Sequence, residues 1–133
     1  MRALALGAAV ALALGASPAQ AATADNPLPV LWCDITITNP TQLYTSYVYA
    51  YVEVKCNRNV TAIGGYLSLY RDGTFLGYEE IRLYNTAYAY KLNMVSCVPG
   101  NYHVMGYGWA NLNGGPHAFD KRVATTPIPI TCT

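Results

Sequence analysis

The chain has 133 residues, of which eight are basic and seven acidic, giving a formal net charge of +1. Charged residues make up 11% of the sequence, and they form neither a basic stripe nor an acidic tail. This balance argues against a phosphate backbone or an anionic lipid surface as a partner, so we expect no nucleic-acid binding and no membrane binding.

The first residues have the order of a secretory signal peptide. A positive start, Met1-Arg2, precedes an apolar stretch from Ala3 to Leu14, and Ala19-Gln20-Ala21 has small residues at the cleavage positions. The apolar stretch is too short to span a bilayer. We therefore predict a signal peptide over residues 1–21 and a secreted, extracellular protein.

The next segment, residues 22–30, is polar and contains two prolines. Asn26-Pro27 and Leu28-Pro29 favour an extended backbone. We predict an extended N-terminal arm here, with Asn26, Leu28 and Val30 as candidate binding residues, followed by a β-sandwich domain over residues 31–133. Such an arm can enter a cleft or add a strand to an exposed sheet edge.

Two strands are predicted next, over residues 31–38 and 44–56. The first ends at Asn39-Pro40-Thr41. In the second, the even positions from Val48 to Cys56 are apolar, and the odd positions begin with Tyr47, Tyr49 and Tyr51. This period of two is typical of a strand with one core face and one outer face.

The segment 57–59, Asn-Arg-Asn, is predicted to turn into a strand over residues 60–70. Its core face carries three apolar side chains, and Tyr66 and Tyr70 lie on its other face. Asp72-Gly73 then predicts a tight hairpin turn, because both residues tolerate the positive φ angles that such a turn requires.

Four further strands follow the hairpin turn, over residues 75–83, 87–96, 102–111 and 123–132. Tyr88 and Tyr90 share one face of the second of these. Pro127 and Pro129 cannot donate to a ladder, which places the last strand at a sheet edge. About seven short strands with turns between them indicate an all-β fold, a small antiparallel β-sandwich of the immunoglobulin-like kind.

Four cysteines, Cys33, Cys56, Cys97 and Cys132, occur in a chain predicted to be exported, which indicates two disulfides. We favour Cys33–Cys56 and Cys97–Cys132, with a Cys56–Cys97 bridge across the sandwich as the rival pairing. A tight hairpin at Asn39 to Thr41 would place Cys33 opposite roughly Val48, so the favoured pairing requires the first strand to bend or to cross between sheets.

The sequence contains no arrangement of residues typical of a catalytic or metal site. The cysteines lack the close spacing of zinc ligands, and no serine sits in a Gly-x-Ser-x-Gly turn. Glu79 and Glu80 are adjacent in a strand and must point to opposite faces, so they cannot act as a pair on one glycosidic bond. His103 and His117 are expected on a strand and in a loop. We expect neither enzymatic activity nor a metal or other cofactor.

Tyrosine is the unusual component of the sequence, with twelve residues in the chain. Any single tyrosine is explained by its strand propensity and cross-strand stacking. Rows of tyrosines on an outer face instead favour an amphipathic binding platform. The candidate binding residues on the sheet are therefore Tyr47, Tyr49, Tyr51, Tyr66 and Tyr70.

Three short segments resemble features of small secreted proteins of filamentous soil bacteria. They are Cys97 to Tyr102, Ile130-Thr131-Cys132 and Trp32-Cys33. These proteins are similar to the adaptor subunits of umbrella toxin particles. Such adaptors join a lectin-like subunit to a large toxin subunit that bears a ring of repeats. The resemblance implies a protein-interaction role and assigns no individual residue.

Three hypotheses follow for the function. The first is a secreted, non-enzymatic interaction module, an adaptor in an extracellular assembly, which binds another secreted protein through the arm and a tyrosine-rich sheet face. The second is a carbohydrate-binding module that uses the tyrosines for stacking on a glycan. The third is an inhibitor of a secreted hydrolase, with a binding loop over residues 111–119. The sequence lacks the exposed Trp-Arg-Tyr triplet of small α-amylase inhibitors, which weakens the third hypothesis.

Overall fold

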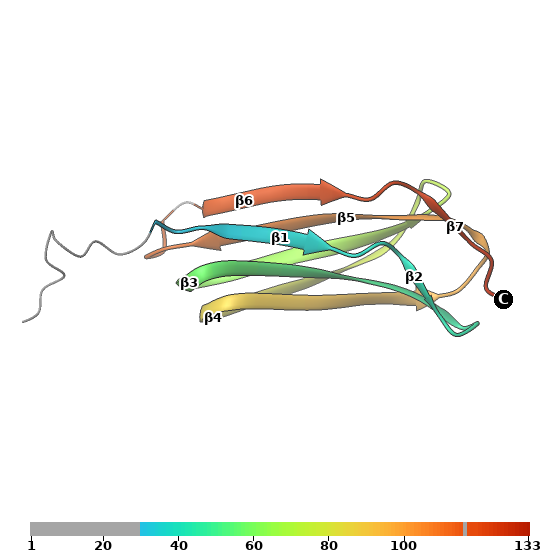
Figure 1. Ribbon diagram of the computed structural model, residues 1–133, viewed down its shortest axis with the longest axis horizontal. Coiled ribbons are helices and arrows are strands. Elements are labelled where there is room, and N and C mark those ends of the chain that lie inside the picture. Colours follow the sequence, from blue (N-terminus) through green and yellow to red (C-terminus); the bar gives the residue numbers. More distant parts are fainter. Residues whose placement is uncertain (1–29, 116) are drawn as a thin grey trace, which may run out of the picture. The chain divides into compact units, whose positions relative to one another are not determined.

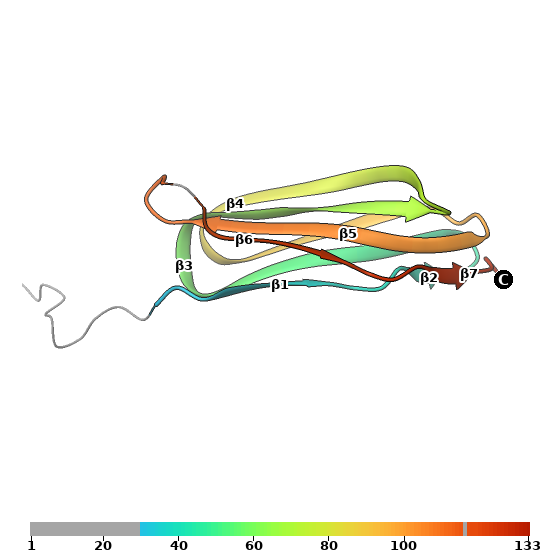
Figure 2. The same cartoon turned by 90° about the horizontal axis from the view of Figure 1, so that it is seen from above.

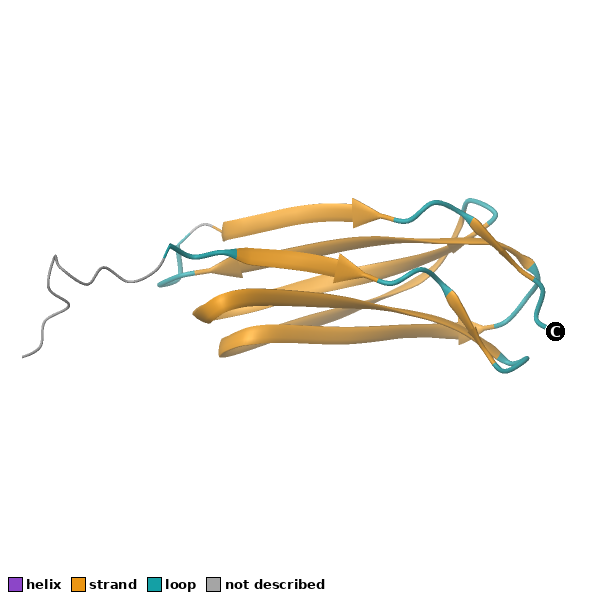
Figure 3. Ribbon diagram, viewed as in Figure 1, coloured by secondary structure: helices purple, strands orange, loops and turns teal. Residues whose placement is uncertain are grey.

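In the computed structural model the chain divides into two units, Met1–Val30 and Leu31–Thr133, and residues 30–115 and 117–133 are described. The predicted signal peptide and residues 22–29 of the arm lie outside the described residues. The second unit consists of strands and connecting loops (Figure 3). Its strands are β1 (Cys33–Ile37), β2 (Thr41–Leu43), β3 (Tyr47–Arg71), β4 (Thr74–Ser96), β5 (Gly100–Asn111), β6 (His117–Ala124) and β7 (Ile128–Ile130).

These seven strands form one antiparallel sheet that folds over into two layers (Figure 1). The sheet can fold over because β3 and β4 are long. Both strands pass from one layer to the other, and they do so at the same end of the domain (Figure 2). The first layer contains β1 and β2, residues 47–56 of β3 and residues 88–96 of β4. The second layer contains residues 60–71 of β3, residues 74–86 of β4, and β5, β6 and β7.

The core lies between the two layers. Val48, Ala50, Val52 and Val54 of the first layer have no exposed surface, and neither have Ile63, Leu67 and Leu69 of the second. The layers approach closely at Gly108, where a β-carbon would lie 2.7 Å from Cγ2 of Val54. The period of two in the sequence therefore identifies the core-facing positions of both halves of β3.

The end at which β3 and β4 change layers, called the crossover end below, contains residues 57–59 and 85–87. A turn was predicted at residues 57–59, which is wrong, because β3 continues through a ladder irregularity between Lys55 and Val60. The Asn57 N–H donates to the Trp32 carbonyl at 2.8 Å, and Asn57 Oδ1 accepts from the Trp32 N–H at 2.9 Å. The polar segment is thereby held against the start of the domain. The predicted break before residue 87 is likewise absent, and Asn85 takes a positive φ of 53° within β4.

The first disulfide, Cys33–Cys56, lies near the crossover end. The favoured pairing is confirmed, but the expectation that the first strand bends away or crosses between sheets is wrong. The hairpin turn lies at residues 44–46, later than predicted, so β1 and β2 both pair with β3 and Cys33 is directly opposite Cys56. Tyr44, predicted to begin a strand, stands in this turn with a φ of 53°.

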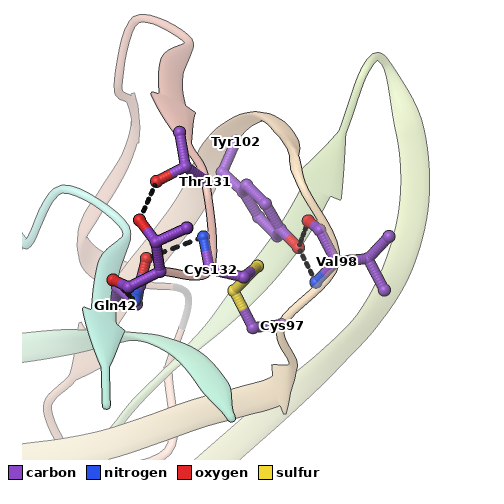
Figure 4. The surroundings of a disulfide bond; sticks show 7 residues. Gln42, Cys97, Val98, Tyr102, Thr131 and Cys132 are labelled. Atoms are coloured by element: carbon purple, nitrogen blue, oxygen red, sulfur yellow. Dashed lines mark hydrogen bonds between the residues drawn. A yellow bond between two sulfur atoms is a disulfide. The ribbon is translucent and has the colours of Figure 1, made fainter. Parts of the chain in front are cut away.

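The second disulfide, Cys97–Cys132, lies at the opposite end, called the tail end below, and connects the residue after β4 to the segment after β7 (Figure 4). The Tyr102 hydroxyl donates to the Val98 carbonyl at 2.6 Å and accepts from the Val98 N–H at 3.1 Å. This buried tyrosine fixes the turn between β4 and β5 in the manner of the tyrosine corner of immunoglobulin-type sandwiches. Gln42 of β2 accepts from the Cys132 N–H at 3.0 Å and donates to the Thr133 carbonyl at 3.0 Å.

The last predicted strand, residues 123–132, is divided in the structure. β6 ends at Ala124, and β7 begins after Pro127. Between them, Thr125 makes two hydrogen bonds to Val104 of β5. Its N–H donates to the Val104 carbonyl at 3.0 Å, and its Oγ1 accepts from the Val104 N–H at 3.0 Å. β7 pairs with β5 alone, so its predicted place at a sheet edge is confirmed.

The fold-class prediction, an all-β antiparallel sandwich of seven strands with two disulfides, is confirmed. Two disulfides indicate folding in an oxidising environment. Among the described residues no helix is long and apolar enough to cross a membrane.

Candidate functional site: two aromatic outer faces

The outer face of the first layer, called the tyrosine face below, contains the three predicted tyrosines of β3. Tyr47, Tyr49 and Tyr51 alternate with buried core residues, and Tyr47 is 45% exposed. Ladder pairing places five residues of β4 beside the outward-facing row of β3 from Tyr47 to Lys55. They are Ser96, Met94, Leu92, Tyr90 and Tyr88.

Cross-strand contacts order the rings of the tyrosine face. The rings of Tyr51 and Tyr90 lie 5.2 Å apart with a tilt of 40°. The Tyr88 hydroxyl donates to Glu53 Oε2 at 3.0 Å. Desolvation, followed by this hydrogen bond and the negative charge of Glu53, raises the pKa of the Tyr88 phenol above its usual value. The phenol therefore stays protonated and remains a donor to Glu53 at neutral pH.

The outer face of the second layer, called the mixed face below, contains Tyr66 and Tyr70. The predicted tyrosines of β3 thus do not form one surface, because the layers turn their outer sides away from each other. Tyr66 packs on Tyr107 of β5 with ring centroids 5.4 Å apart. Tyr70 stacks on His103 at 4.7 Å with an interplanar angle of 7°. His103 is therefore half-buried on a strand, as predicted.

Trp109 of β5 lies on the mixed face opposite Gly64, towards the crossover end, and it was not singled out from the sequence. Its indole lies over Gly64, where a β-carbon would be 2.7 Å from a ring carbon. Arg82 of β4 places its guanidinium carbon 5.0 Å from the ring centroid, and His117 stacks at 4.8 Å. These neighbours leave Trp109 only 6% exposed. The sequence signal for this contact was Gly64-Gly65 in mid-strand, which marks a close approach of another group.

His117 was predicted in a loop, but it begins β6. Its Nδ1 lies 3.2 Å from the Tyr107 hydroxyl and 4.0 Å from Asp120 Oδ2. Burial, followed by the negative charge of Asp120, raises the pKa of the Tyr107 phenol, although Arg122 above the ring opposes the shift. The mixed face therefore interleaves aromatic rings with charges of both signs, whereas aromatic and apolar side chains dominate the tyrosine face.

A depression of about 400 Å³ opens on the mixed face, lined by Tyr66, Ser68, Tyr78 and Glu80. These residues form two neighbouring cross-strand pairs, Ser68 with Tyr78 and Tyr66 with Glu80. The depression exists because the small side chain of Ser68 stands between larger rings. Tyr78 is 59% exposed, whereas Ser68 is only 8% exposed.

The adjacent carboxylates of β4 are separated as the sequence predicted. Glu80 lines the depression, whereas Glu79 pairs with Leu67 in the core-facing row and its Oε2 lies 3.6 Å from Lys91 Nζ of the first layer. Within residues 30–115 and 117–133, no cluster of three or more metal-ligating side chains occurs.

The predicted arm residues are only partly covered by the structure. Asn26 and Leu28 lie outside the described residues, and Val30 is 88% exposed.

Comparisons with known proteins identify no family. No protein-family model matches the chain, and a search of curated proteins also finds no match. Among solved structures, the chain is similar to selenomethionine-labelled β-glucosidase from Kluyveromyces marxianus, with a TM-score of 0.34 and 9% identity over 75% of this chain and 15% of that one. The same enzyme in complex with glucose gives a TM-score of 0.34 and 10% identity over 76% of this chain. The chain thus spans 15% of the length of these enzymes, and so slight a likeness says nothing about its activity.

Proposed function

We propose that the protein is a secreted, non-enzymatic interaction module that binds another secreted protein through the tyrosine face. The observation that carries the proposal is the exposure of neighbouring aromatic and apolar side chains there. Tyr47, Tyr88, Tyr90 and Met94 are each between 43% and 45% exposed. Groups of exposed apolar side chains on one face of a soluble protein mark interaction sites.

The distribution of polarity on the tyrosine face supports a protein partner. Its charged residues, Asp34, Glu53 and Lys55, lie at one end, where Glu53 pairs with Tyr90 and Lys55 with Tyr88 and Asp34, and the Glu53 carboxylate accepts a hydrogen bond from the Tyr88 hydroxyl. The centre, where Tyr49 pairs with Met94 and Tyr51 with Leu92, has no charged side chain. An apolar, aromatic centre with charges towards the rim is the usual composition of a protein–protein interface.

The adaptor role extends this proposal to a second contact. The resemblance to adaptor subunits of umbrella toxin particles implies a protein that joins two others. The arm over residues 22–30 supplies a contact separate from the tyrosine face in this scheme. The disulfides are compatible with the extracellular location that such an assembly requires.

The experiment that tests the proposal is capture of partners from the culture medium of the host with immobilised wild-type protein and variants. Tyr49→Ser removes the central ring of the face. A central aromatic anchor contributes about 2 kcal/mol, so the variant should bind a captured protein about thirtyfold more weakly. Its thermal midpoint should stay near that of the wild type.

The matched control is Tyr84→Ser, because Tyr84 is 62% exposed and belongs to the outer row of the second layer. This variant should bind the captured protein like the wild type. Unchanged binding by Tyr49→Ser would contradict the proposal. A fall in stability of several kcal/mol in Tyr49→Ser would assign the row a structural role instead.

A further inference from the structure

The depression on the mixed face offers a specific set of chemical groups. Tyr66 and Tyr78 stand at diagonal positions and supply ring faces together with hydroxyls that can donate and accept. Ser68 supplies one hydroxyl, and Glu80 supplies a carboxylate whose oxygens accept hydrogen bonds. Within the described residues, Glu80 takes part in none of the observed ion pairs, which are Lys91–Glu79, His117–Asp120 and Lys121–Asp34. Its carboxylate thus remains available to a ligand.

The charges around the depression balance each other. Arg82 follows Glu80 on the same face of β4, and Arg122 lies above Tyr107, the cross-strand neighbour of Tyr66. A cationic ligand at Glu80 would meet Arg82, and an anionic ligand would meet Glu80 itself. Because charge complementarity selects ligands of opposite sign, this arrangement favours a ligand without net charge.

The ligand must also have an apolar surface that packs on the exposed rings and hydrogen-bond donors for the Glu80 carboxylate. The C–H face of a sugar ring is apolar and packs on an aromatic ring, while its hydroxyls donate to acceptors in the plane of the sugar. A volume of about 400 Å³ is in the range of small-molecule sites. A purely apolar ligand would leave the carboxylate of Glu80 without a partner on the covered surface.

We propose that this depression binds a short neutral glycan. Tyr78 is the stacking platform, Tyr66 closes the opposite corner, and Glu80 accepts hydrogen bonds from neighbouring hydroxyls. We expect binding without cleavage, because Glu79, the carboxylate adjacent to Glu80 in sequence, belongs to the core-facing row beside Lys91. This glycan site lies on the face opposite the proposed protein interface and stands independently of it.

The proposal is tested with a panel of neutral and charged oligosaccharides, followed by calorimetric titration of every glycan that binds. The wild type should bind at least one neutral glycan, with a Kd in the micromolar to millimolar range. Tyr78→Ala should weaken that binding about tenfold, because the stacking surface is lost. Glu80→Gln should weaken it severalfold, since the amide accepts less strongly than the carboxylate.

Two matched variants control for folding and for the choice of face. Tyr84→Ala removes a comparably exposed ring from the same strand and face but outside the depression, and it should leave the Kd unchanged. Tyr49→Ser should also leave it unchanged, so that failure of the protein-binding proposal and failure of the glycan proposal give different results. Binding of charged glycans alone, or of none up to millimolar concentrations, would overturn the proposal.

A measurement on the wild type keeps the test independent of the variants. In an amide NMR titration with the bound neutral glycan, the largest shifts should occur at Ser68, Tyr78 and Glu80. Shifts centred on residues 47–51 or 88–94 would overturn the assignment of the site.

Discussion

The two ends of the sandwich join its layers by different means. At the crossover end the backbone itself passes between layers twice, in β3 and in β4, and the nearby Cys33–Cys56 disulfide connects neighbours within one hairpin. At the tail end no strand continues from one layer to the other. There the connection consists of the turn between β4 and β5, the Cys97–Cys132 disulfide and the hydrogen bonds of Gln42 (Figure 4). Side-chain chemistry should therefore matter more at the tail end.

Replacing each disulfide by an alanine pair tests this comparison with the largest expected effect. Cys97→Ala with Cys132→Ala should lower the free energy of unfolding by about 3–4 kcal/mol, because a closed loop is released in the unfolded chain. Cys33→Ala with Cys56→Ala should cost slightly less, by about 0.3–0.4 kcal/mol, since its loop is shorter, 23 against 35 residues of separation. Urea unfolding measures both values. A larger loss for the Cys33–Cys56 pair would reverse the comparison.

Between the two ends, Asn93 of the first layer connects to the second. It is 4% exposed, and its Nδ2 donates to the Leu67 carbonyl at 3.1 Å and to the Gly77 carbonyl at 3.3 Å. Asn93→Ala should lower the free energy of unfolding by about 2 kcal/mol, because both bonds are lost in a buried setting. Asn101→Ala, on an exposed strand position, is the control. A loss below about 0.5 kcal/mol for Asn93→Ala would show that the crossover already fixes the layers.

Tyr102 sharpens the comparison at the tail end. Tyr102→Phe removes the hydroxyl that both donates to and accepts from Val98 while leaving the buried ring in place. We expect a loss of about 1–2 kcal/mol in thermal or urea unfolding. Tyr44→Phe serves as control, because Tyr44 is 83% exposed, and it should leave stability unchanged. Equal effects of the two variants would count against a role for this hydroxyl in joining the layers.

Gln42 should give the smallest effect of the four. Gln42→Ala removes both bonds to the residues after β7, and because the site is partly solvated the cost should be about 0.5–1 kcal/mol. Amide hydrogen exchange offers a sharper measurement, since the Cys132 N–H loses its acceptor and should exchange faster. Protection of residues 52–56 should stay at the wild-type level. Faster exchange at both ends would mean that the ends are coupled.

The sequence predicted strands in which apolar residues occupy every second position without interruption. It did not predict strands in which polar residues interrupt that pattern. Val48 to Val54 identified the first half of β3, and Asp72-Gly73 identified its hairpin with β4. Most of β6, residues 117–122, was not predicted, because this strand is mostly exposed and lacks an apolar row. Spacing alone cannot show that Asn57 to Asn59 carries one strand between two layers, since the same polar residues are typical of turns.

Spacing along the sequence also fails to show which surface side chains come together from different strands. The outward-facing tyrosines of β3 have odd numbers before residues 57–59 and even numbers after them. This pattern predicts two rows of tyrosines, but it does not show that the rows lie on opposite faces of the sandwich. Trp109, Arg82 and His117 come together from three strands through Gly64, a contact that depends on sheet order. The depression at Ser68 depends in the same way on the register between β3 and β4.

That register begins at the two-residue turn at Asp72 and Gly73, whose φ angles are 49° and 79°, and it shifts at the irregularities between Leu69 and Tyr70 and between Lys55 and Val60. A slip of one residue in the ladder between Val60 and Leu69 would exchange the inner and outer rows of β4 in the second layer. Because hairpins close within about 1–10 µs, this pairing can form before the distant ends of the domain meet. Assembly should then proceed outward from the middle of the chain, with the residues after β7 joining last. In oxidative refolding with thiol trapping, Cys33–Cys56 should accumulate before Cys97–Cys132, and the reverse order would exclude this sequence of events.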